Sequence, residues 1–502
     1  MEQINLILSG VTFAFTLKNI LAIIAGTTIG VIFGVLPGIG GSAAMALLLP
    51  MTLGWHPATA LTMMGTIFFS SSFGGSITSI LINTPGDTSN AATMMDGYPM
   101  TQQGRGAEAI GISSTCVLVG GGVGWILLSF SAPLIASFAA RFGPAENTVL
   151  AILALSIISA LVMSSPIKGL MSAAMGLFIS TIGFDSITGF PRYVRGVFSL
   201  YEGIPFMPAV IGMFALSQVI TLGMEGGAIS TVTELKGKLT AGIKIFFQYP
   251  ATIFRSLLIG IIIGALPAAG RTTSSFMAYA DAVRASKNPE SFGKGNPQGV
   301  LAPELANNSC AMGDFIPTLA LGIPGSAGCA VFLGIMLLHG VVPGPRAFID
   351  NGQTLYALLT SLFLSTVVLF FFGITGSKYF ARISLIQNEI IVPLILIFSL
   401  LGAFAVRNYF IDVIICCLFG FLGYFMIRHE YGTIPLLLGM VLGDMAEKNF
   451  HRALIMSDGH YTIFWSSWIA KILLAMSILS IIWPYAKLVY KKSKPTKPNI
   501  YV

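Results

Sequence analysis

Long apolar segments with few charged residues dominate the pattern along this chain. Nine of them have a length and composition close to those of a membrane-spanning helix, which needs about 20 mostly apolar residues. They cover residues 111–140, 148–163, 168–184, 208–222, 251–266, 355–375, 390–406, 412–427 and 463–484. With the more ambiguous apolar segments added, the pattern predicts an all-α polytopic membrane protein of about ten to twelve transmembrane helices.

Glycine and proline interrupt several of these apolar segments. The stretch "GVLPGIGGS" (34–42) lies inside an apolar run of about 30 residues, where both residue types are unfavourable for a continuous helix. Three similar stretches are "NTPGDTSN" (83–90), "LPAAGRTTSS" (266–275) and "GIPGSAG" (322–328). Because irregular backbone in a membrane needs protein or a watery cavity around it, we expect broken helices or re-entrant hairpins here.

The four breaks belong to an internal repeat. "IGVIFGVLPGIG" (29–40) aligns with "IGIIIGALPAAG" (259–270) at seven identical positions of twelve, with an offset of 230 residues (264 − 34 = 230). "FGGSITSILINTPGD" (73–87) aligns with "MGDFIPTLALGIPGS" (312–326), with an offset of 239 (324 − 85 = 239). We therefore predict two structural repeats, and both inverted and parallel repeats fit this alignment.

The repeat predicts five regions along the chain. They are a first membrane repeat (1–233), a linker (234–249), the core of a second membrane repeat (250–350), C-terminal transmembrane helices (351–485) and a basic cytoplasmic tail (486–502).

Composition narrows the class of protein. Hydrophobic residues make up 55% of the chain and charged residues 9%, whereas soluble proteins carry about 25% charged residues. The net charge is +7, and five lysines in the last 17 residues supply most of it. Because this positive charge is local, no nucleic-acid surface is expected. The positive-inside rule places the C-terminus in the cytoplasm. The five cysteines show no CxxC spacing and predict neither a disulfide framework nor a metal cluster. The N-terminus lacks a basic n-region, so no cleavable signal peptide is predicted.

Corresponding breaks in two repeats are the best sequence indication of a transporter's binding site. A half-helix that begins inside the membrane presents free N–H groups and a positive dipole end, which bind an anion such as a carboxylate. Unwound carbonyls and hydroxyls bind a small cation such as Na⁺. The candidate polar ligands are Ser42, Asn83, Thr84, Thr88, Asn90, Thr272, Thr273, Asn307, Asn308 and Ser326. Close packing of helices through small residues is the alternative interpretation.

Four ionisable residues lie near the breaks: Asp87, Arg271, Glu304 and Asp314. Charges at membrane depth are costly and usually functional. We expect Arg271 to pair with a substrate carboxylate, or with Asp314 or Glu304, and solvation at a cavity mouth is the alternative. Ser42 is expected to cap the helix that returns after the first break.

Motifs for catalysis are not evident. "GIGGSA" lacks the GxGxxG spacing, and neither HExxH nor GxSxG occurs. We therefore expect no enzyme and no cofactor. Solute transport is the leading hypothesis, and a channel or scaffold membrane subunit without coupled transport is the alternative.

Several linked motifs resemble one family. "GVLPGIGGSAAMALLLPMT", "GGSITSILINTPG", "DGYPMTQQGRGAEA", "APELANNS", "IPTLALGIPGS" and "LLHGVVPGP" are similar to the large membrane subunit of tripartite tricarboxylate transporters, over about residues 25–348. The resemblance implies a secondary transporter of the bacterial inner membrane that takes up citrate or other carboxylates with Na⁺ or H⁺. It also implies two partners, a small membrane subunit and a periplasmic solute-binding protein.

The resemblance extends to the site residues. It implies a first half-site of Pro37, Gly38, Gly40, Asn83, Pro85 and Gly86, and a second of Pro267, Gly270, Asn307, Asn308, Pro324 and Gly325. With Ser42, Thr84, Arg271, Thr272 and Ser326 these residues form the predicted substrate and ion site, with a Na⁺ position expected near Asn83 and Asn308.

Overall fold

The computed structural model describes residues 2–36, 39–160, 166–185, 187–225, 237–267, 270–383 and 388–493. These residues are almost entirely helical, which confirms the predicted all-α class, and β1 (Gly183–Phe184) and β2 (Pro191–Arg192) are the only strands among them. Two compact units are interleaved along the chain: unit 1 comprises Met1–Arg141 and Pro205–Phe425, and unit 2 comprises Phe142–Ile204 and Met426–Val502. The boundaries predicted at 233, 249 and 350 do not coincide with the limits of these units.

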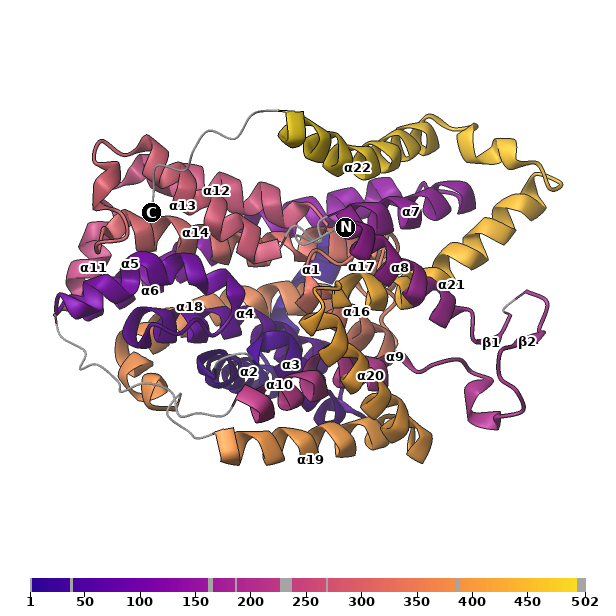
Figure 1. The fold of residues 1–502 in the computed structure, drawn as a ribbon, viewed down its shortest axis with the longest axis horizontal. Helices are drawn as coiled ribbons and strands as arrows, with labels where there is room; N and C mark the ends of the chain where they lie inside the picture. The colour runs from indigo at the N-terminus through magenta and orange to yellow at the C-terminus, as the bar shows by residue number, and fades with distance from the viewer. Residues whose placement is uncertain are drawn as a thin grey trace. The chain divides into compact units, whose positions relative to one another are not determined.

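Unit 1 holds both repeats (Figure 1). The first contains α1 (Glu2–Ala14), α2 (Leu17–Val35), α3 (Gly40–Leu48), α4 (Pro57–Ile82), α5 (Ala91–Gln102) and α6 (Gly106–Ala139). The second contains α11 (Leu239–Phe246), α12 (Pro250–Ala265), α13 (Gly270–Ala285), α14 (Pro297–Gly313), α15 (Phe315–Leu321), α16 (Ala327–Leu338), α17 (Ala347–Asp350) and α18 (Gly352–Ile383). The unit is completed by α9 (Phe206–Val210), α10 (Ser217–Glu225), α19 (Asn388–Arg407) and most of α20 (Phe410–Arg428).

Helix length distinguishes the spans from the broken segments. Seven helices among the described residues are long and apolar enough to cross a membrane, or eight if the bent pair α11–α12 counts as one span. Six more apolar helices have only 10–17 residues, and these account for the higher number predicted from sequence. Two of the short helices, α3 and α16, begin at the predicted breaks. The apolar window of α4 is wholly buried inside the protein, so α4 forms the centre of unit 1.

The two copies break their helices with the same backbone geometry. Leu36 ends α2 with φ −84° and ψ 112°, and Leu266, 230 positions later, ends α12 with φ −85° and ψ 120°. The helices that follow begin at Gly40 and Gly270, both in the left-handed region, with φ +58° and +70°. Glycine suits these positions because it has no Cβ to resist a positive φ. The predicted repeat with broken helices is confirmed.

Each repeat is assembled around a close helix pair of small residues. A Cβ at Gly30 of α2 would strike the Ser70 hydroxyl and the Ile67 carbonyl of α4. A Cβ at Gly260 of α12 would strike the equivalent groups of α14, the Ser309 hydroxyl and the Ala306 carbonyl. Small residues let membrane helices approach closely. The resulting van der Waals packing holds the two helices together although no hydrophobic driving force acts between them in lipid.

The repeats also exchange contacts. In the first, α1 packs on α18 of the other repeat through Gly10, and in the second, α11 packs on α6 through Gly242. Likewise α4 lies against α18, and α14 lies against α6. This reciprocal packing holds the two sets of breaks close together.

Unit 2 contains α7 (Pro144–Ala160), α8 (Pro166–Ser180), β1, β2, α21 (Thr433–Met456) and α22 (Trp468–Ser493). Gly176 and Gly439 bring α8 and α21 into backbone contact. The ring of Phe450 stacks on that of Phe464 with centroids 5.3 Å apart, beside a small core of Ala145, Val149 and Ala453. Arg192 of β2 binds both carboxylate oxygens of Glu447 at 2.6 and 3.0 Å, which fastens the strand loop to α21.

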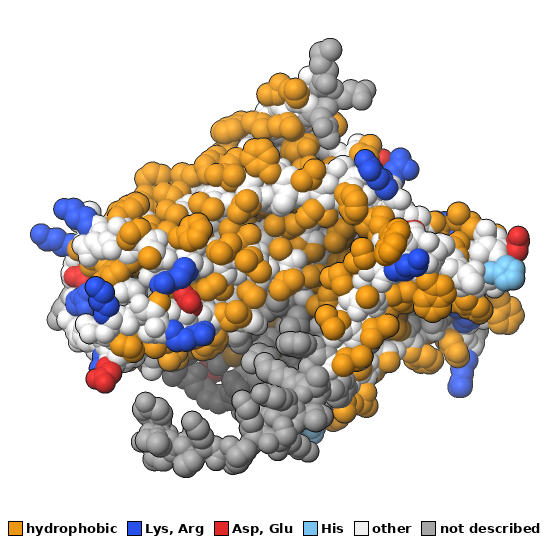
Figure 2. Space-filling view, turned by 90° about the horizontal axis from the view of Figure 1, so that it is seen from above, with side chains coloured by type: hydrophobic (Ala, Val, Ile, Leu, Met, Phe, Trp, Pro, Cys, Tyr) orange, Lys and Arg blue, Asp and Glu red, His pale blue; other side chains and the backbone are white. Residues whose placement is uncertain are grey.

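The surface agrees with a membrane location. Figure 2 shows hydrophobic side chains over most of the visible face, with lysine and arginine gathered towards its edges. Large hydrophobic side chains are exposed on the protein surface, among them Phe130, Leu134, Phe254 and Phe371. Exposure of so many apolar side chains to water would be unfavourable, whereas contact with lipid accounts for it.

The glycine contacts in the first repeat predict a specific loss of stability. We expect Gly30→Val to lower the free energy of unfolding by about 1–3 kcal/mol, because the added atoms force α2 away from α4. Gly122→Val on α6 is the matched control, since a Cβ at Gly122 meets no described atom within 4 Å. Thermal unfolding of the purified variants measures the difference, and equal midpoints for the two would contradict the close α2–α4 contact.

Candidate functional site

The breaks of the two repeats meet around a buried arginine. Arg271 is the second residue of α13, and its side chain is only 8% exposed. Its Nη2 lies 3.7 Å from Oδ2 of Asp87, in the second break of the first repeat, and Asp87 is 27% exposed. At that distance the two groups form an ion pair but no hydrogen bond. Nη1 of Arg271 is buried and has no hydrogen-bond partner among the described residues.

An aromatic ring covers the guanidinium. The Cζ of Arg271 lies 4.5 Å from the centre of the Phe68 ring of α4, a cation–π contact. The same ring fills the space left by Gly328 in the first turn of α16, and it meets Phe315 edge-on at 5.6 Å. Phe68 thus joins the break that precedes α13 to the break that precedes α16.

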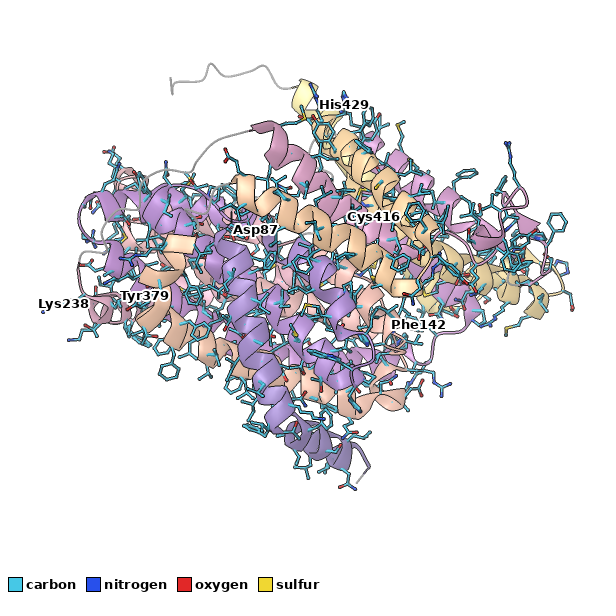
Figure 3. All side chains as sticks on the ribbon, turned by 90° about the horizontal axis from the view of Figure 1, so that it is seen from below. Asp87, Phe142, Lys238, Tyr379, Cys416 and His429 are labelled. Atoms are coloured by element: carbon cyan, nitrogen blue, oxygen red, sulfur yellow. The ribbon has the colours of Figure 1, made fainter. Side chains whose placement is uncertain are left out.

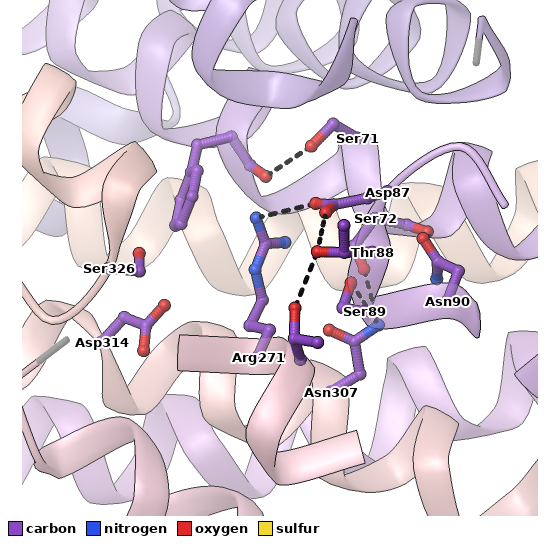
Figure 4. A network of polar contacts seen from close by, with 12 residues as sticks. Ser71, Ser72, Asp87, Thr88, Ser89, Asn90, Arg271, Asn307, Asp314 and Ser326 are labelled. Carbon is purple, nitrogen blue, oxygen red and sulfur yellow. Dashed lines mark hydrogen bonds and ion pairs between the residues drawn. The ribbon is translucent and has the colours of Figure 1, made fainter. Parts of the chain in front are cut away.

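Hydroxyls and amides link the break in one repeat to the other repeat (Figure 4). Thr88 Oγ1 lies 2.8 Å from Thr272 Oγ1. The Asn307 amide of α14 donates to the hydroxyl of Ser72 at 2.7 Å and to that of Ser89 at 3.4 Å, and its own Oδ1 has no partner among the described residues. In Figure 3, Asp87 lies within the outline of the helices and Lys238 at its edge.

A second buried carboxylate lies on the opposite side of Arg271 from Asp87 in this view (Figure 4). Asp314, between α14 and α15, is fully buried, and its Oδ2 has no hydrogen-bond partner among the described residues. A Cβ at Gly325 would come within 2.5 Å of the Asp314 carbonyl oxygen, so only glycine fits there. Ser326, next in the chain, caps α16 by accepting a hydrogen bond from the Cys329 amide.

This geometry is accompanied by similarity over most of the chain. A family model described as the tripartite tricarboxylate transporter TctA family matches residues 20–438. The chain is 33% identical over 482 residues to an uncharacterized 52.8 kDa protein in the TAR-I ttuC' 3' region of Agrobacterium vitis, covering 96% of each chain. It is also 34% identical over 223 residues to an uncharacterized protein in the TAR-II ttuC' 3' region of that organism, covering 44% of this chain and 92% of the relative.

The chain belongs to the TctA family. The resemblance seen in the sequence is therefore confirmed, and the chain is a multi-pass membrane subunit of the tripartite tricarboxylate transporter type. The matched region includes all four breaks.

The predicted residues of the first half-site fall in different surroundings in this TctA protein. Pro37 and Gly38 lie outside the described residues. Gly40 begins α3, and Ser42 lies within α3 rather than at its cap, because Ile39 holds the cap position and no side chain caps the helix. Gly86 is buried between the Gly34 carbonyl and the Cα of Gly75, while Thr84 bonds weakly to the Ile82 carbonyl at 3.4 Å and Pro85 is half-buried.

Asn83 has a clear backbone role. It ends α4 in the left-handed region with φ +59°, and its exposed side chain makes no hydrogen bond among the described residues. The equivalent residue in the second repeat is Gly322, which ends α15 with φ +71°. Asparagine and glycine are the residues that most readily adopt this conformation at a helix end.

The second half-site is more compact. Helix α13 begins with Gly270, Arg271 and Thr272, which face the Asp87–Thr88 break. The segment Pro324–Ser326 lies beside Asp314. Pro267, which precedes α13, is half-buried. Asn307 and Asn308 diverge, because Asn308 donates to the Glu304 carbonyl of its own helix and packs on Gly120 of α6. Arg271 pairs with Asp87 and not with Glu304, which is bonded to hydroxyls instead.

Sequence reasoning missed Phe68, Ser72 and Ser89. The run "FFSSSFGGS" (68–76) carried a usable signal, since several serines inside an apolar stretch that otherwise reads as a core helix are unusual. Phe68 carried none, because phenylalanine is common in membrane helices and its contact with Arg271 joins residues about 200 positions apart.

The left-handed position of Asn83 generates a prediction that separates backbone from ligand roles. We expect Asn83→Gly to retain folding and transport, because glycine occupies the equivalent position in the second repeat. Asn83→Val should lower the free energy of unfolding by about 1–2 kcal/mol, since a branched side chain resists a positive φ. Uptake assays together with thermal unfolding test this, and loss of transport in a well-folded Asn83→Gly variant would instead support a ligand role.

Proposed function

We propose that this chain is the substrate-carrying membrane subunit of a binding-protein-dependent secondary transporter, which takes up citrate or a similar carboxylate together with a cation. The breaks of the two repeats form its substrate site, centred on Arg271. TctA family membership supports transport rather than catalysis.

The unsatisfied guanidinium of Arg271 carries the proposal. A buried charge with one long ion pair and a free N–H group is poorly compensated, and such groups persist in membrane proteins where function needs them. A planar guanidinium binds carboxylates in a bidentate manner. The N-terminus of α13 adds a positive dipole end at the same point. A substrate carboxylate therefore finds a cation and free donors at the junction of the repeats.

The residues proposed for the site lie at the breaks or beside them. They are Gly40, Thr88, Gly270, Arg271, Thr272, Asn307, Gly325 and Ser326. The cation-binding roles predicted for Asn83 and Asn308 remain predictions, and either Na⁺ or H⁺ is compatible with symport at this stage.

Family membership supports a proposal for the assembly and its location. We propose a small membrane subunit and a periplasmic solute-binding protein as partners, in the bacterial inner membrane, with the C-terminus in the cytoplasm. Substrate choice then rests in part on the binding protein, because it delivers the carboxylate to the membrane subunit.

Replacing Arg271 tests the proposal. Proteoliposomes that contain the complete complex are assayed for citrate uptake, and we expect Arg271→Gln to weaken apparent substrate affinity about 10- to 100-fold, the equivalent of about 1.5–3 kcal/mol for hydrogen bonds to a charged group. Arg255→Gln is the control, since Arg255 forms a separate, partly exposed ion pair with Asp281 at 3.0 Å. Unchanged affinity in Arg271→Gln would overturn the site assignment.

The ion gradient separates symport from the alternative of a channel or scaffold subunit. We expect accumulation of citrate only when an inward Na⁺ or H⁺ gradient is imposed. Citrate flux that is independent of both gradients in the complete complex would favour a channel.

A further inference from the structure

A carboxylate inside unit 1 is enclosed by hydroxyl groups. Glu304, on α14 in the second repeat, is fully buried. Its Oε1 accepts a hydrogen bond from Thr93 of α5 at 2.6 Å, and its Oε2 accepts one from Ser113 of α6 at 2.7 Å. The Ser76 hydroxyl of α4 lies 2.8 and 2.9 Å from the two oxygens. Four helices from both repeats thus meet at one acid.

No cation neutralises this acid among the described residues. The charged side chains on the helices packed against α14 have partners elsewhere or are exposed. Three arginines form ion pairs, namely Arg271 with Asp87, Arg255 with Asp281 and Arg105 with Glu108. Asp96 binds Tyr279 and two backbone amides, and Lys244 and Arg284 are exposed. Asp314 and Cys310 contact each other at the far end of α14. The titratable group that faces Glu304 is the Cys116 thiol of α6, which donates to the Leu301 carbonyl.

An ionised carboxylate in such a place is very unfavourable. Hydroxyl donors reduce the cost of burying a charge but do not remove it, whereas a bound proton or cation does. The oxygens around Glu304 touch at hydrogen-bonding distances of 2.6–2.9 Å, so a metal ion would have to push them apart to reach the carboxylate. A proton needs no such space.

The first repeat shows that the fold does not require an acid at this position. The residue equivalent to Glu304 is Gly65 of α4 (304 − 65 = 239), and a Cβ there would meet Leu358 at 2.7 Å and Phe332 at 3.6 Å. Phe332 and Phe315 are themselves the equivalents of Thr93 and Ser76, and their buried rings pack edge-on at 5.2 Å. The same backbone is therefore filled by apolar side chains in one repeat and by an acid with hydroxyls in the other.

The acid is also connected to the substrate junction. The Asn90 amide donates to the Ser76 hydroxyl at 2.9 Å and to the Ser72 carbonyl at 3.1 Å, and the Ser72 hydroxyl accepts from Asn307. Asn307 also reaches Ser89. Because Asn90 and Ser89 both belong to the 83–90 break, the hydrogen bonds of Ser76 and Asn90 link Glu304 to that break. Acidic side chains inside a membrane protein commonly take part in proton transfer.

We propose that Glu304 is the proton-binding site that couples carboxylate uptake to a proton gradient. The proposal rests on the proposed transport function and narrows its cation to H⁺. When the outward-facing state admits water, the Glu304 carboxylate takes a proton from hydronium and becomes a neutral acid, leaving water. When the inward-facing state admits water, the acid returns that proton to cytoplasmic water. No oxidation or covalent bond to the substrate is involved.

Glu304→Gln separates proton coupling from a structural role. Glutamine keeps the size and hydrogen bonding of the protonated acid, but it cannot release a proton. In proteoliposomes with the complete complex, we expect this variant to lose proton-driven accumulation of citrate while it retains exchange of external labelled citrate for internal citrate, a reaction that needs no net proton movement. A trapped pH dye should report acidification on citrate addition for the wild type and none for the variant. Glu108→Gln on α6, a partly exposed acid, is the matched control.

The possible outcomes test proton coupling at Glu304 separately from transport itself. Full proton-driven accumulation by Glu304→Gln would overturn the proposal, as would wild-type uptake driven by Na⁺ at equal internal and external pH. Both results leave carboxylate transport itself intact, whereas absence of gradient-driven uptake in the wild type would overturn the proposed function.

A spectroscopic measurement keeps the proposal testable if Glu304→Gln fails to fold or transport is absent. Infrared difference spectra of the wild-type complex between acidic and alkaline buffer should contain the carbonyl band of a buried protonated carboxylic acid. Glu304→Asp should shift this band, and Glu108→Gln should leave it unchanged. A band that is absent, or that does not respond to pH, would refute a titrating proton at Glu304.

Discussion

The structure depends on one constraint: backbone groups at a helix break inside a membrane must be satisfied or covered by protein. Unit 1 meets it by bringing backbone against backbone. Gly86 in the second break lies on the Gly34 carbonyl at the end of α2, and Gly325 lies against the backbone of Asp314. These contacts need the Gly and Ser surfaces of α2, α4, α12 and α14, which bring the helices close enough for each break to be sheltered by its own repeat.

Function arises where the two repeats differ. Their backbones match at the caps, the left-handed residues and the glycine contacts, yet three charged residues of the second repeat have no charged counterpart in the first. Arg271, Glu304 and Asp314 correspond to Gly41, Gly65 and Gly75 in the first repeat, at offsets of 230, 239 and 239. Each of these glycines adjoins a side chain from a neighbouring element, namely Ser71, Leu358 and Asn90. A symmetrical scaffold therefore carries an asymmetric set of charges.

Much of this scaffold was predictable from sequence, because breaks, left-handed residues and repeat offsets are local features. The ends of α2 and α12 at Leu36 and Leu266 follow directly from the Leu-Pro steps. The partners of individual side chains were harder to predict from sequence, because they depend on how the helices pack. Sequence offered Glu304 as a partner for Arg271, yet Glu304 binds hydroxyls up to 228 positions away (304 − 76 = 228), and Asp87 takes the place beside Arg271. The ligand role predicted for Asn83 stays a prediction, and its left-handed backbone conformation was a second role that the sequence did not reveal.

The burial of both proposed binding groups gives symport a physical basis. Arg271 and Glu304 lie in one water-poor core, where charges interact far more strongly than in water. An anion bound at Arg271 adds negative charge to that core, and a proton at Glu304 removes it, so each ligand favours the other. Linkage makes this preference reciprocal: a proton on Glu304 must strengthen carboxylate binding by the same factor by which carboxylate strengthens proton binding. A carrier that changes its accessible side only when the core is near neutral would then move the two together. The hydrogen bonds of Ser76 and Asn90 tie Glu304 to the same 83–90 break whose Asp87 pairs with Arg271.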